Sequence, residues 1–280
     1  MGRRRPRGGM PAVFDGVSQR YDRDGVEFFG PAGERLVALT GIGPGEWVLD
    51  IGCGRGAVLF PAARAAGPTG RAVGVDLAPG MVEATRHEAA LRGLVQVTTQ
   101  VRDGQDPPFP AGSFDAVTGG MSIHMLGDLP AAYRAYHRLL APGGRLGLSA
   151  PATVTEPEPE VFGLASVARM AADHDTGSGV YPYTPAFGGP ERVRAELTAA
   201  GFHDVRVHRE TGLLTAADPA ALLRWTWGHG MRLLWERVPP RLRPGYERLI
   251  TSEARRRSTS PERTVLRVPL LYVIARRDPL

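Results

Sequence analysis

The sequence predicts an α/β protein with a doubly wound, seven-stranded, mostly parallel sheet and helical cap insertions. Seven short apolar or β-branched runs are separated by segments of helical composition along most of the chain. The first run, residues 48–56, reads Val-Leu-Asp-Ile-Gly-Cys-Gly-Arg-Gly and leads into a helix-forming segment at 57–66. Alternating glycines after a strand allow a tight turn and close approach of a ligand, so the other elements are placed around this turn.

The composition indicates a single domain that is nearly neutral apart from a basic amino-terminal end. The 280 residues, 42% of them hydrophobic, suit a single α/β domain with insertions. Four of the five net positive charges come from Arg3, Arg4, Arg5 and Arg7. The chain lacks lysine and asparagine and is rich in Ala, Gly, Pro and Arg, which indicates a bias in nucleotide composition. We therefore expect no nucleic-acid partner.

The single cysteine, Cys53, excludes an internal disulfide framework and favours a reducing compartment. No apolar run is long enough to cross a membrane, and residues 1–11 lack the apolar core of a signal peptide. We expect a cytoplasmic protein with no membrane partner. No spacing of Cys, His and Asp suggests a zinc or iron site, so we expect no metal.

The glycine turn alone does not name its ligand. Gly52, Gly54 and Ala57 also fit a dinucleotide fingerprint, with Asp76 about twenty residues beyond Gly56. Asp50 helps to decide, because a carboxylate before the first glycine repels a pyrophosphate and suits a cation. S-adenosylmethionine carries a sulfonium, an ammonium and a ribose, so it is complementary to both acids.

Residues 48–56 resemble the first motif of the class I S-adenosylmethionine-dependent methyltransferases. This resemblance implies a Rossmann-like methyltransferase fold and cofactor contacts at Asp50, Gly52, Gly54 and Gly56. Further signals follow in the family's order at 70–76, 102–104, 109–117 and 139–146. The resemblance covers roughly residues 14–150.

A second strand at 70–76 ends in Asp76, where a doubly wound sheet presents a carboxylate to two ribose hydroxyls. The alternative for Asp76 is a helix cap before the predicted helix at 79–92. Leu77 and Met81 would flank the adenine.

A third strand at 94–101 leads into Asp103 and Gly104. In the family, an acid in this loop accepts a hydrogen bond from the adenine amino group. The alternative for Asp103 is a turn-forming role, since Asp-Gly is a common turn dipeptide.

Two residues are candidates for catalysis. His124 lies in the segment 119–126, beyond the fourth strand, with Met121 beside it at the ligand-binding edge. His124 can remove a proton from an acceptor or can simply pack there. Tyr21 lies in 14–22, which is similar to the start of the ubiquinone and menaquinone methyltransferases, where it would approach the methionine end of the cofactor. The alternative is that Tyr21 fastens a helix at 14–21, ahead of a second helix at 31–39.

The remaining core elements are a helix at 128–140, a closing turn at 141–144 and strands at 145–150, 202–209 and 265–275, with a helix at 191–200. In the family, the final strand inserts antiparallel between the fifth and sixth. Its presence leads us to expect a complete chain.

Two insertions are expected to determine substrate specificity. Residues 151–190 form a lid with Tyr181 and Tyr183, and 211–263 form a cap. One cap helix is expected to carry several aromatic residues that either build a cap core or line an apolar pocket. These residues are Trp225, Trp227, His229, Met231 and Trp235.

The expected organisation can be stated by residue range. It comprises a disordered basic tail (1–11), amino-terminal helices that cover the cofactor (12–45), the cofactor-binding core (46–150), the lid (151–190), further core (191–210), the helical substrate cap (211–263) and a final core strand (264–280).

The predicted function is methyl transfer from S-adenosylmethionine to a small, aromatic or apolar, natural-product-like substrate, leaving S-adenosylhomocysteine. His124, Tyr181, Tyr183, Trp225, Trp227 and His229 are the candidate substrate-binding residues. The family branch favours a carbon acceptor, with oxygen and nitrogen as alternatives. A macromolecule methyltransferase, a nonenzymatic cofactor-binding protein and a nicotinamide-dependent dehydrogenase remain open, and a monomer or homodimer is expected.

Overall fold

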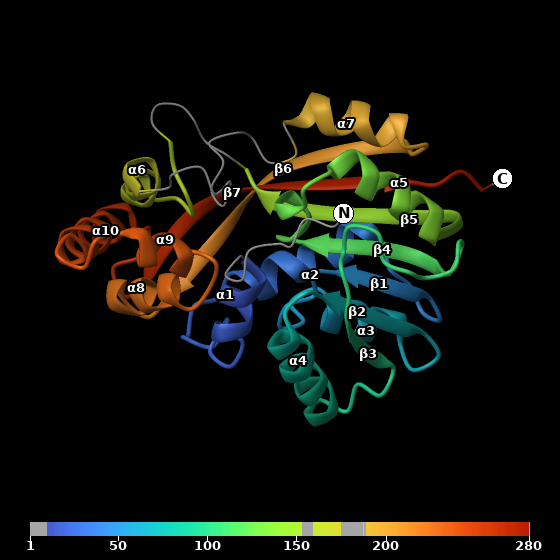
Figure 1. Cartoon of the computed structure of the whole chain (residues 1–280), viewed down its shortest axis with the longest axis horizontal. Helices are drawn as coiled ribbons and strands as arrows, with labels where there is room; N and C mark the ends of the chain where they lie inside the picture. The colour runs from blue at the N-terminus through green and yellow to red at the C-terminus, as the bar shows by residue number, and fades with distance from the viewer. Residues whose placement is uncertain (1–9, 153–158, 175–186, 188, 280) are drawn as a thin grey trace, which may run out of the picture.

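The computed structural model describes residues 10–152, 159–174, 187 and 189–279 (Figure 1). The strands are β1 (Trp47–Ile51), β2 (Arg71–Asp76), β3 (Val97–Val101), β4 (Phe114–Gly120), β5 (Leu140–Pro151), β6 (His203–Ala216) and β7 (Thr264–Arg276). The helices are α1 (Met10–Val17), α2 (Phe29–Thr40), α3 (Leu59–Ala66), α4 (Pro79–Leu91), α5 (Leu129–Leu139), α6 (Ala165–His174), α7 (Pro190–Ala199), α8 (Pro219–Trp227), α9 (Arg232–Arg237) and α10 (Arg243–Arg257), with a 3-10 helix, η1 (Ile123–Met125).

The strands form one sheet in the order β3-β2-β1-β4-β5-β7-β6. β7 is antiparallel to both of its neighbours and the other pairs are parallel, so the predicted fold class is confirmed. The chain order reverses between β1 and β4. In doubly wound sheets, ligands bind outside the carboxyl ends of the strands at such a reversal.

Both faces of the sheet are covered, which explains the nearly continuous apolar sequence of β1. Val48 belongs to a core shared with Leu36 of α2 and Ala62 of α3. Leu49 faces the other core, which includes Tyr136 of α5 and Leu197 of α7. The covering helices begin at local signals. The Asp128 side chain caps α5 by accepting a hydrogen bond from the Ala131 N–H at 2.9 Å, and Asp218 caps α8 in the same way.

Helix α1 begins at Met10, earlier than the predicted start at residue 14. Met10 and Pro11, expected in the disordered tail, therefore belong to a helix. Proline is well tolerated in a first helical turn because its missing N–H has no partner to lose there. β5 also starts early, at Leu140, so that residues 141–144, predicted as a closing turn, lie within its span beside a register shift against β4.

Strand β6 is longer than predicted. It continues to Ala216, which pairs with Thr264 of β7, whereas the sequence predicted a strand at 202–209 and a helical cap from 211. The extension is stabilised by antiparallel pairing with β7 and by burial of Leu214 and Ala216. Figure 1 shows β6 and β7 crossing from the main sheet to the cap helices at the other end of the molecule.

The cap consists of α6, α8, α9 and α10. The prediction of one helix from Trp225 to Trp235 was wrong, because α8 ends at Trp227 and the chain turns before α9. α6, predicted within the lid, packs against α10. The Glu253 carboxylate on α10 accepts hydrogen bonds from the N–H groups of Ala165 and Ser166 at 2.9 and 2.8 Å, which satisfies the start of α6.

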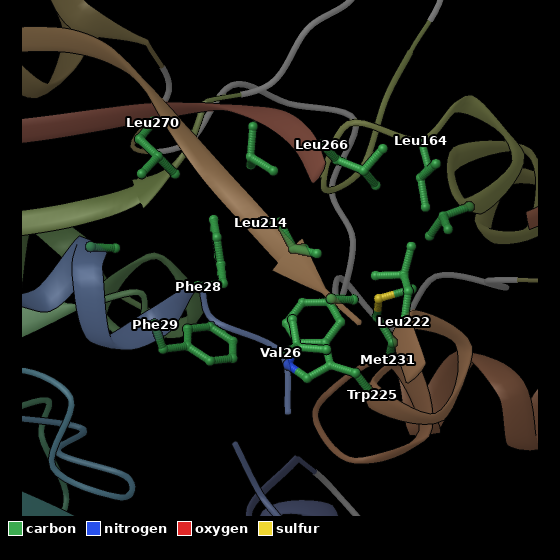
Figure 2. Close-up of a cluster of buried hydrophobic side chains, with 14 of the residues drawn as sticks. Val26, Phe28, Phe29, Leu164, Leu214, Leu222, Trp225, Met231, Leu266 and Leu270 are labelled. Atoms are coloured by element: carbon green, nitrogen blue, oxygen red, sulfur yellow. The ribbon is translucent and has the colours of Figure 1, made fainter. Parts of the chain in front are cut away.

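The cap core is continuous with the core of the amino-terminal segment (Figure 2). The Trp225 ring lies 6.2 Å from the Phe28 ring and 5.7 Å from the Phe29 ring, between ring centroids. Leu222 and Met231 complete the cluster from the cap side. The segment before α2, with the first residue of α2, therefore joins the cap to the core that covers the main sheet.

Candidate functional site

A first cavity lies at the carboxyl ends of β1, β2 and β4, where the strand order reverses. It contains about 1050 Å³ of empty space, its open mouth included, which is ample for a small-molecule ligand. All predicted cofactor-binding residues line it except Asp50 and Gly56. These lining residues are Tyr21, Gly52, Gly54, Asp76, Leu77, Met81, Asp103, Gly104 and Met121.

The cavity also has walls that the sequence did not single out. Pro11 and Phe14 come from α1, Gln105 follows the third strand, and the loop after β4 adds a further group. This group is Ser122, Ile123, Met125, Leu126 and Gly127. For Gln105 and the residues after β4, the position behind a parallel strand is the sequence signal, whereas Phe14 belongs to the segment at 14–22 that carries the family resemblance.

Asp76 is fixed at the rim of the cavity by two backbone contacts. One carboxylate oxygen accepts a hydrogen bond from the Gly54 N–H, and the other from the Ala78 N–H, both at 2.9 Å. Burial raises the pKa of Asp76, and these backbone hydrogen bonds oppose the rise. Each oxygen has a further lone pair, so a pair of ligand hydroxyls can still be accepted. The contact to Ala78 fixes the turn that leads into α4, whereas the Gly80 N–H of the first helical turn donates to the Asp15 carboxylate at 2.6 Å, so the alternative that Asp76 caps the helix is not supported.

The three glycines of the turn have different surroundings. Gly54, at φ +47°, has open space where a Cβ would stand, and it lines the cavity. A Cβ on Gly52 would lie 2.5 Å from the Ser122 Cβ. A Cβ on Gly56, at φ +84°, would lie 2.5 Å from the Phe60 ring. Gly56 therefore serves close packing against Phe60 and is not among the residues that line the cavity, so its contact with the ligand stays a prediction.

Asp50 lies behind the glycine turn and does not line the cavity. Its carboxylate accepts a hydrogen bond from the Thr118 hydroxyl at 2.9 Å, and burial raises its pKa to about 7. A direct contact between Asp50 and the ligand stays a prediction, and Asp50 is not among the residues that line this cavity. Thr118 pairs with Asp50 across β1 and β4, a partnership that depends on strand order and cannot be read from the local sequence.

A second cavity adjoins the first. Phe14, Tyr21, Met121 and Met125 line both cavities, so the two spaces meet at these side chains. The remaining described walls of the second cavity are mainly apolar and carry two histidines. They are Phe29, His124, Pro151, Phe162, His229 and Gly230.

Both histidines of the second cavity are neutral near pH 7. Burial lowers the pKa of His124 to about 4 and that of His229 to about 3. Within the part of the chain that the structure describes, the buried Nδ1 of His124 has no hydrogen-bond partner. A neutral imidazole nitrogen of this kind can accept a proton or donate a hydrogen bond, depending on its tautomer.

Tyr21 lies at the junction of the two cavities. Its ring stacks on Phe29, with centroids 5.4 Å apart. Burial, with the nearby charges of Asp22 and Asp76, raises the pKa of the Tyr21 hydroxyl well above its usual value. The hydroxyl therefore stays protonated and suits a hydrogen-bond donor rather than a general base.

The tryptophans predicted to bind substrate lie elsewhere. Trp225 is 1% exposed in the cap core, and Trp227 stacks on Trp235 with centroids 5.1 Å apart. Neither lines a described cavity, since the cap needs their large rings for its own packing. Of the predicted substrate-binding residues, the structure brings His124 and His229 together, whereas Tyr181 and Tyr183 lie outside the described residues.

The described residues contain neither a membrane-spanning helix nor a metal-binding cluster. No described helix has the length and apolar character to span a bilayer. Within residues 10–152, 159–174, 187 and 189–279, no group of three or more His, Cys, Asp or Glu side chains is arranged to hold a metal ion.

Comparison with known proteins places this geometry in a family. Residues 48–144 match a family model described as a methyltransferase domain. The nocamycin O-methyltransferase of Saccharothrix syringae is 46% identical over 237 residues, covering 81% of this chain and 84% of that protein. The aklanonic acid methyltransferase DauC of Streptomyces sp. (strain C5) is 50% identical over 139 residues, covering 50% of this chain and 63% of that protein.

Among solved structures, the YcgJ protein of Bacillus subtilis superposes with a TM-score of 0.60 at 18% identity, covering 89% of this chain and 98% of that one. At this identity the likeness concerns the fold alone. The extended match to a methyltransferase and the matching domain, on a sheet of this order, establish that the chain belongs to the class I S-adenosylmethionine-dependent methyltransferases.

Proposed function

We propose that the chain transfers the methyl group of S-adenosylmethionine to an oxygen atom of a small organic acceptor held in the cavity of His124 and His229. The observation that carries this proposal is the junction of the two cavities at Phe14, Tyr21 and Met121, with Met125 beside them. A cofactor in the first cavity and an acceptor in the second would meet there.

The first cavity suits the cofactor. The Asp76 carboxylate, with its free lone pairs, would bind the ribose hydroxyls. Gly54 leaves open space for close approach of the ligand. Leu77 and Met81 would flank the adenine, while Asp103 and Gly104 would border its edge. Tyr21 and Met121 would lie at the methionine end of the cofactor.

When bound, S-adenosylmethionine supplies an electrophilic methyl group. The chain's own residues would orient the acceptor and exclude water from the junction, with α1 and the cap segment at 229–230 as walls. An acceptor hydroxyl must also lose its proton. The neutral imidazole of His124 is our candidate for taking it.

The choice of oxygen departs from the carbon acceptor favoured by the sequence. The S. syringae relative is named as an O-methyltransferase, and its similarity extends over 81% of this chain, which includes most of the part beyond the common core. The mainly apolar walls of the second cavity support a small, aromatic or apolar, natural-product-like acceptor. Carbon methylation remains the second candidate, because the family branch resembled by residues 14–22 contains such enzymes.

We further expect a cytoplasmic monomer or homodimer. We expect no nucleic-acid partner, because the chain beyond its basic end is nearly neutral.

Two successive experiments, on ligand binding and on the methylated product, test the proposal. S-adenosylhomocysteine is expected to raise the melting temperature, whereas NAD and NADP are not. Methyl-labelled S-adenosylmethionine is then offered with a panel of phenols, enols, carboxylic acids, indoles and quinols. Labelled ethers or esters support oxygen transfer, and label on carbon establishes the second candidate. Stabilisation by NAD alone would point to a dehydrogenase, and cofactor binding without transfer would favour a nonenzymatic role.

A further inference from the structure

His229 occupies a turn between α8 and α9 and is 4% exposed. Its ring is enclosed by aromatic neighbours, with centroid distances of 4.0 Å to Trp225, 5.5 Å to Phe162 and 6.1 Å to Phe29. The same residue lines the second cavity. His229 is thus a polar group held by aromatic packing in a mainly apolar wall.

One hydrogen bond determines the tautomer of the His229 imidazole. The Met231 N–H donates to Nδ1 of His229 at 3.3 Å. Because Nδ1 acts as an acceptor and the ring is neutral near pH 7, the ring proton must reside on Nε2. His229 therefore presents an N–H donor at Nε2.

This donor has no acceptor in the described part of the chain. A buried N–H without a partner destabilises a fold, so such a group calls for an explanation in a ligand or a water molecule. The indole N–H of Trp225 is likewise unpartnered there, but Trp225 does not line the cavity. Of the two residues, His229 is the one that lines the cavity.

We propose that the Nε2–H of His229 donates a hydrogen bond to a carbonyl or carboxylate oxygen of the acceptor, and so selects acceptors that carry a C=O group close to the methylated oxygen. This inference rests on the proposed function. His229 acts as a positioning residue: it turns the acceptor so that its reactive oxygen faces the junction at Tyr21 and Met121, while His124 lies in the same cavity.

The described walls favour a neutral C=O over a fully charged acceptor. They contain no Asp, Glu, Lys or Arg side chain among the described residues. A single neutral donor can satisfy a carbonyl oxygen in an apolar site, whereas an isolated carboxylate would be costly to bury there. A carboxylate remains compatible if its second oxygen reaches the cavity mouth.

A matched pair of probes tests the selection. 2'-Hydroxyacetophenone and 2-ethylphenol have similar size and differ in a C=O group beside the hydroxyl. Their dissociation constants are measured by titration calorimetry at millimolar probe with protein saturated by S-adenosylhomocysteine. Wild type is expected to bind the ketone about tenfold more tightly, the effect of one hydrogen bond made in an apolar site.

Two variants assign that preference to His229. His229→Phe keeps a planar ring and removes the donor, so it should bind both probes equally. His229→Gln places an amide N–H near the position of Nε2, so it should retain most of the preference. Equal binding of both probes by wild type, which includes no binding of either, overturns the proposal. A preference that persists in His229→Phe also overturns it.

A spectroscopic measurement keeps the inference testable if His229→Phe does not fold. Nitrogen-15 spectra of the wild-type histidine rings at pH 7 should show His229 neutral, with its proton on Nε2, and the ketone should shift that Nε2 resonance. A proton on Nδ1, a charged ring or an unshifted resonance contradicts the proposal. Failure of S-adenosylhomocysteine to raise the melting temperature would instead count against the proposed function, which separates the two outcomes.

Discussion

The carboxylate of Asp76 accepts a hydrogen bond from the Gly54 N–H at 2.9 Å, although the two residues are 22 positions apart. This contact joins the end of β2 to the glycine turn after β1. It holds the carboxylate at the rim of the first cavity, where the open space beside Gly54 begins. The geometry of the turn and the position of the acid therefore depend on one another.

Replacement of Asp76 tests this arrangement. Asp76→Ala removes the acceptor for two ligand hydroxyls and should weaken binding of S-adenosylhomocysteine by about 1.5–3 kcal/mol, the range for hydrogen bonds to a charged group. Titration calorimetry measures the loss. Glu83→Ala on the exposed side of α4 is a matched control that should bind normally. Unchanged affinity in Asp76→Ala would remove the residue from the cofactor site.

The glycine turn and Asp76 were predictable because the signals are local. Positive φ angles at Gly52, Gly54 and Gly56 require glycine, and Asp76 ends an apolar strand of recognisable length. The order of the sheet followed from the family resemblance. For these elements, the conformation depends on residues that are close together in the sequence.

The cap and the position of Asp50 could not be predicted in the same way. Burial of Asp50 depends on Thr118, which becomes its neighbour only when β4 is placed beside β1. The fate of Trp225 depends on Phe28, nearly 200 positions earlier in the chain. The sequence indicates that the cap carries large aromatic rings but not which partners bury them.

His124 should affect turnover more than binding. If its neutral imidazole accepts the acceptor proton, His124→Ala and His124→Gln should both lower kcat by about 100-fold or more, with the dissociation constant of S-adenosylhomocysteine nearly unchanged. Because burial lowers the pKa of His124 to about 4, this ring imposes no change in kcat between pH 6 and 8. Steady-state rates over that range check the prediction. Wild-type turnover in both variants would assign His124 to packing alone.

The tryptophans should act on stability. Trp225→Ala removes a ring that is 1% exposed in the cap core and should lower the free energy of unfolding by about 3–5 kcal/mol. Truncation of the half-buried Trp227 to alanine should lower the free energy of unfolding by less, because only part of its ring is enclosed. Chemical denaturation gives both values. If Trp227→Ala kept full stability but lost acceptor affinity, its assignment to the cap core would be wrong.

Asp50 should make stability depend on pH. Its folded-state pKa of about 7 lies above the ordinary 3.8, so the folded protein retains a proton that the unfolded chain has already released. The free energy of unfolding should therefore fall as the pH rises from about 4 to 7, by up to about 4 kcal/mol at 1.4 kcal/mol per pKa unit.

Asp50→Asn isolates this contribution. The amide oxygen can still accept the Thr118 hydrogen bond, but the side chain no longer titrates. Asp22, whose pKa burial also raises to about 7, is present in both proteins and cancels in the comparison. Relative to wild type, the variant should gain stability between pH 4 and 7. A constant difference across that range, measured by urea denaturation, would show that Asp50 is ionised in the folded protein.

Gly54 and Gly56 offer a matched pair in which an added methyl group meets open space at one position and the Phe60 ring at the other. Gly54→Ala places Cβ in open space, so only the positive φ opposes it, and the free energy of unfolding should fall by about 1–2 kcal/mol. Because that Cβ enters the cavity, affinity for S-adenosylhomocysteine should fall as well.

Gly56→Ala adds a 2.5 Å contact with the Phe60 ring to its positive φ, so its loss of stability should be about 1–3 kcal/mol greater. Combining Gly56→Ala with Phe60→Leu should relieve part of that loss, so the double variant should be more stable than the sum of the single effects. Thermal denaturation with and without S-adenosylhomocysteine measures both properties, and equal stability of the two alanine variants would contradict the packing role assigned to Gly56.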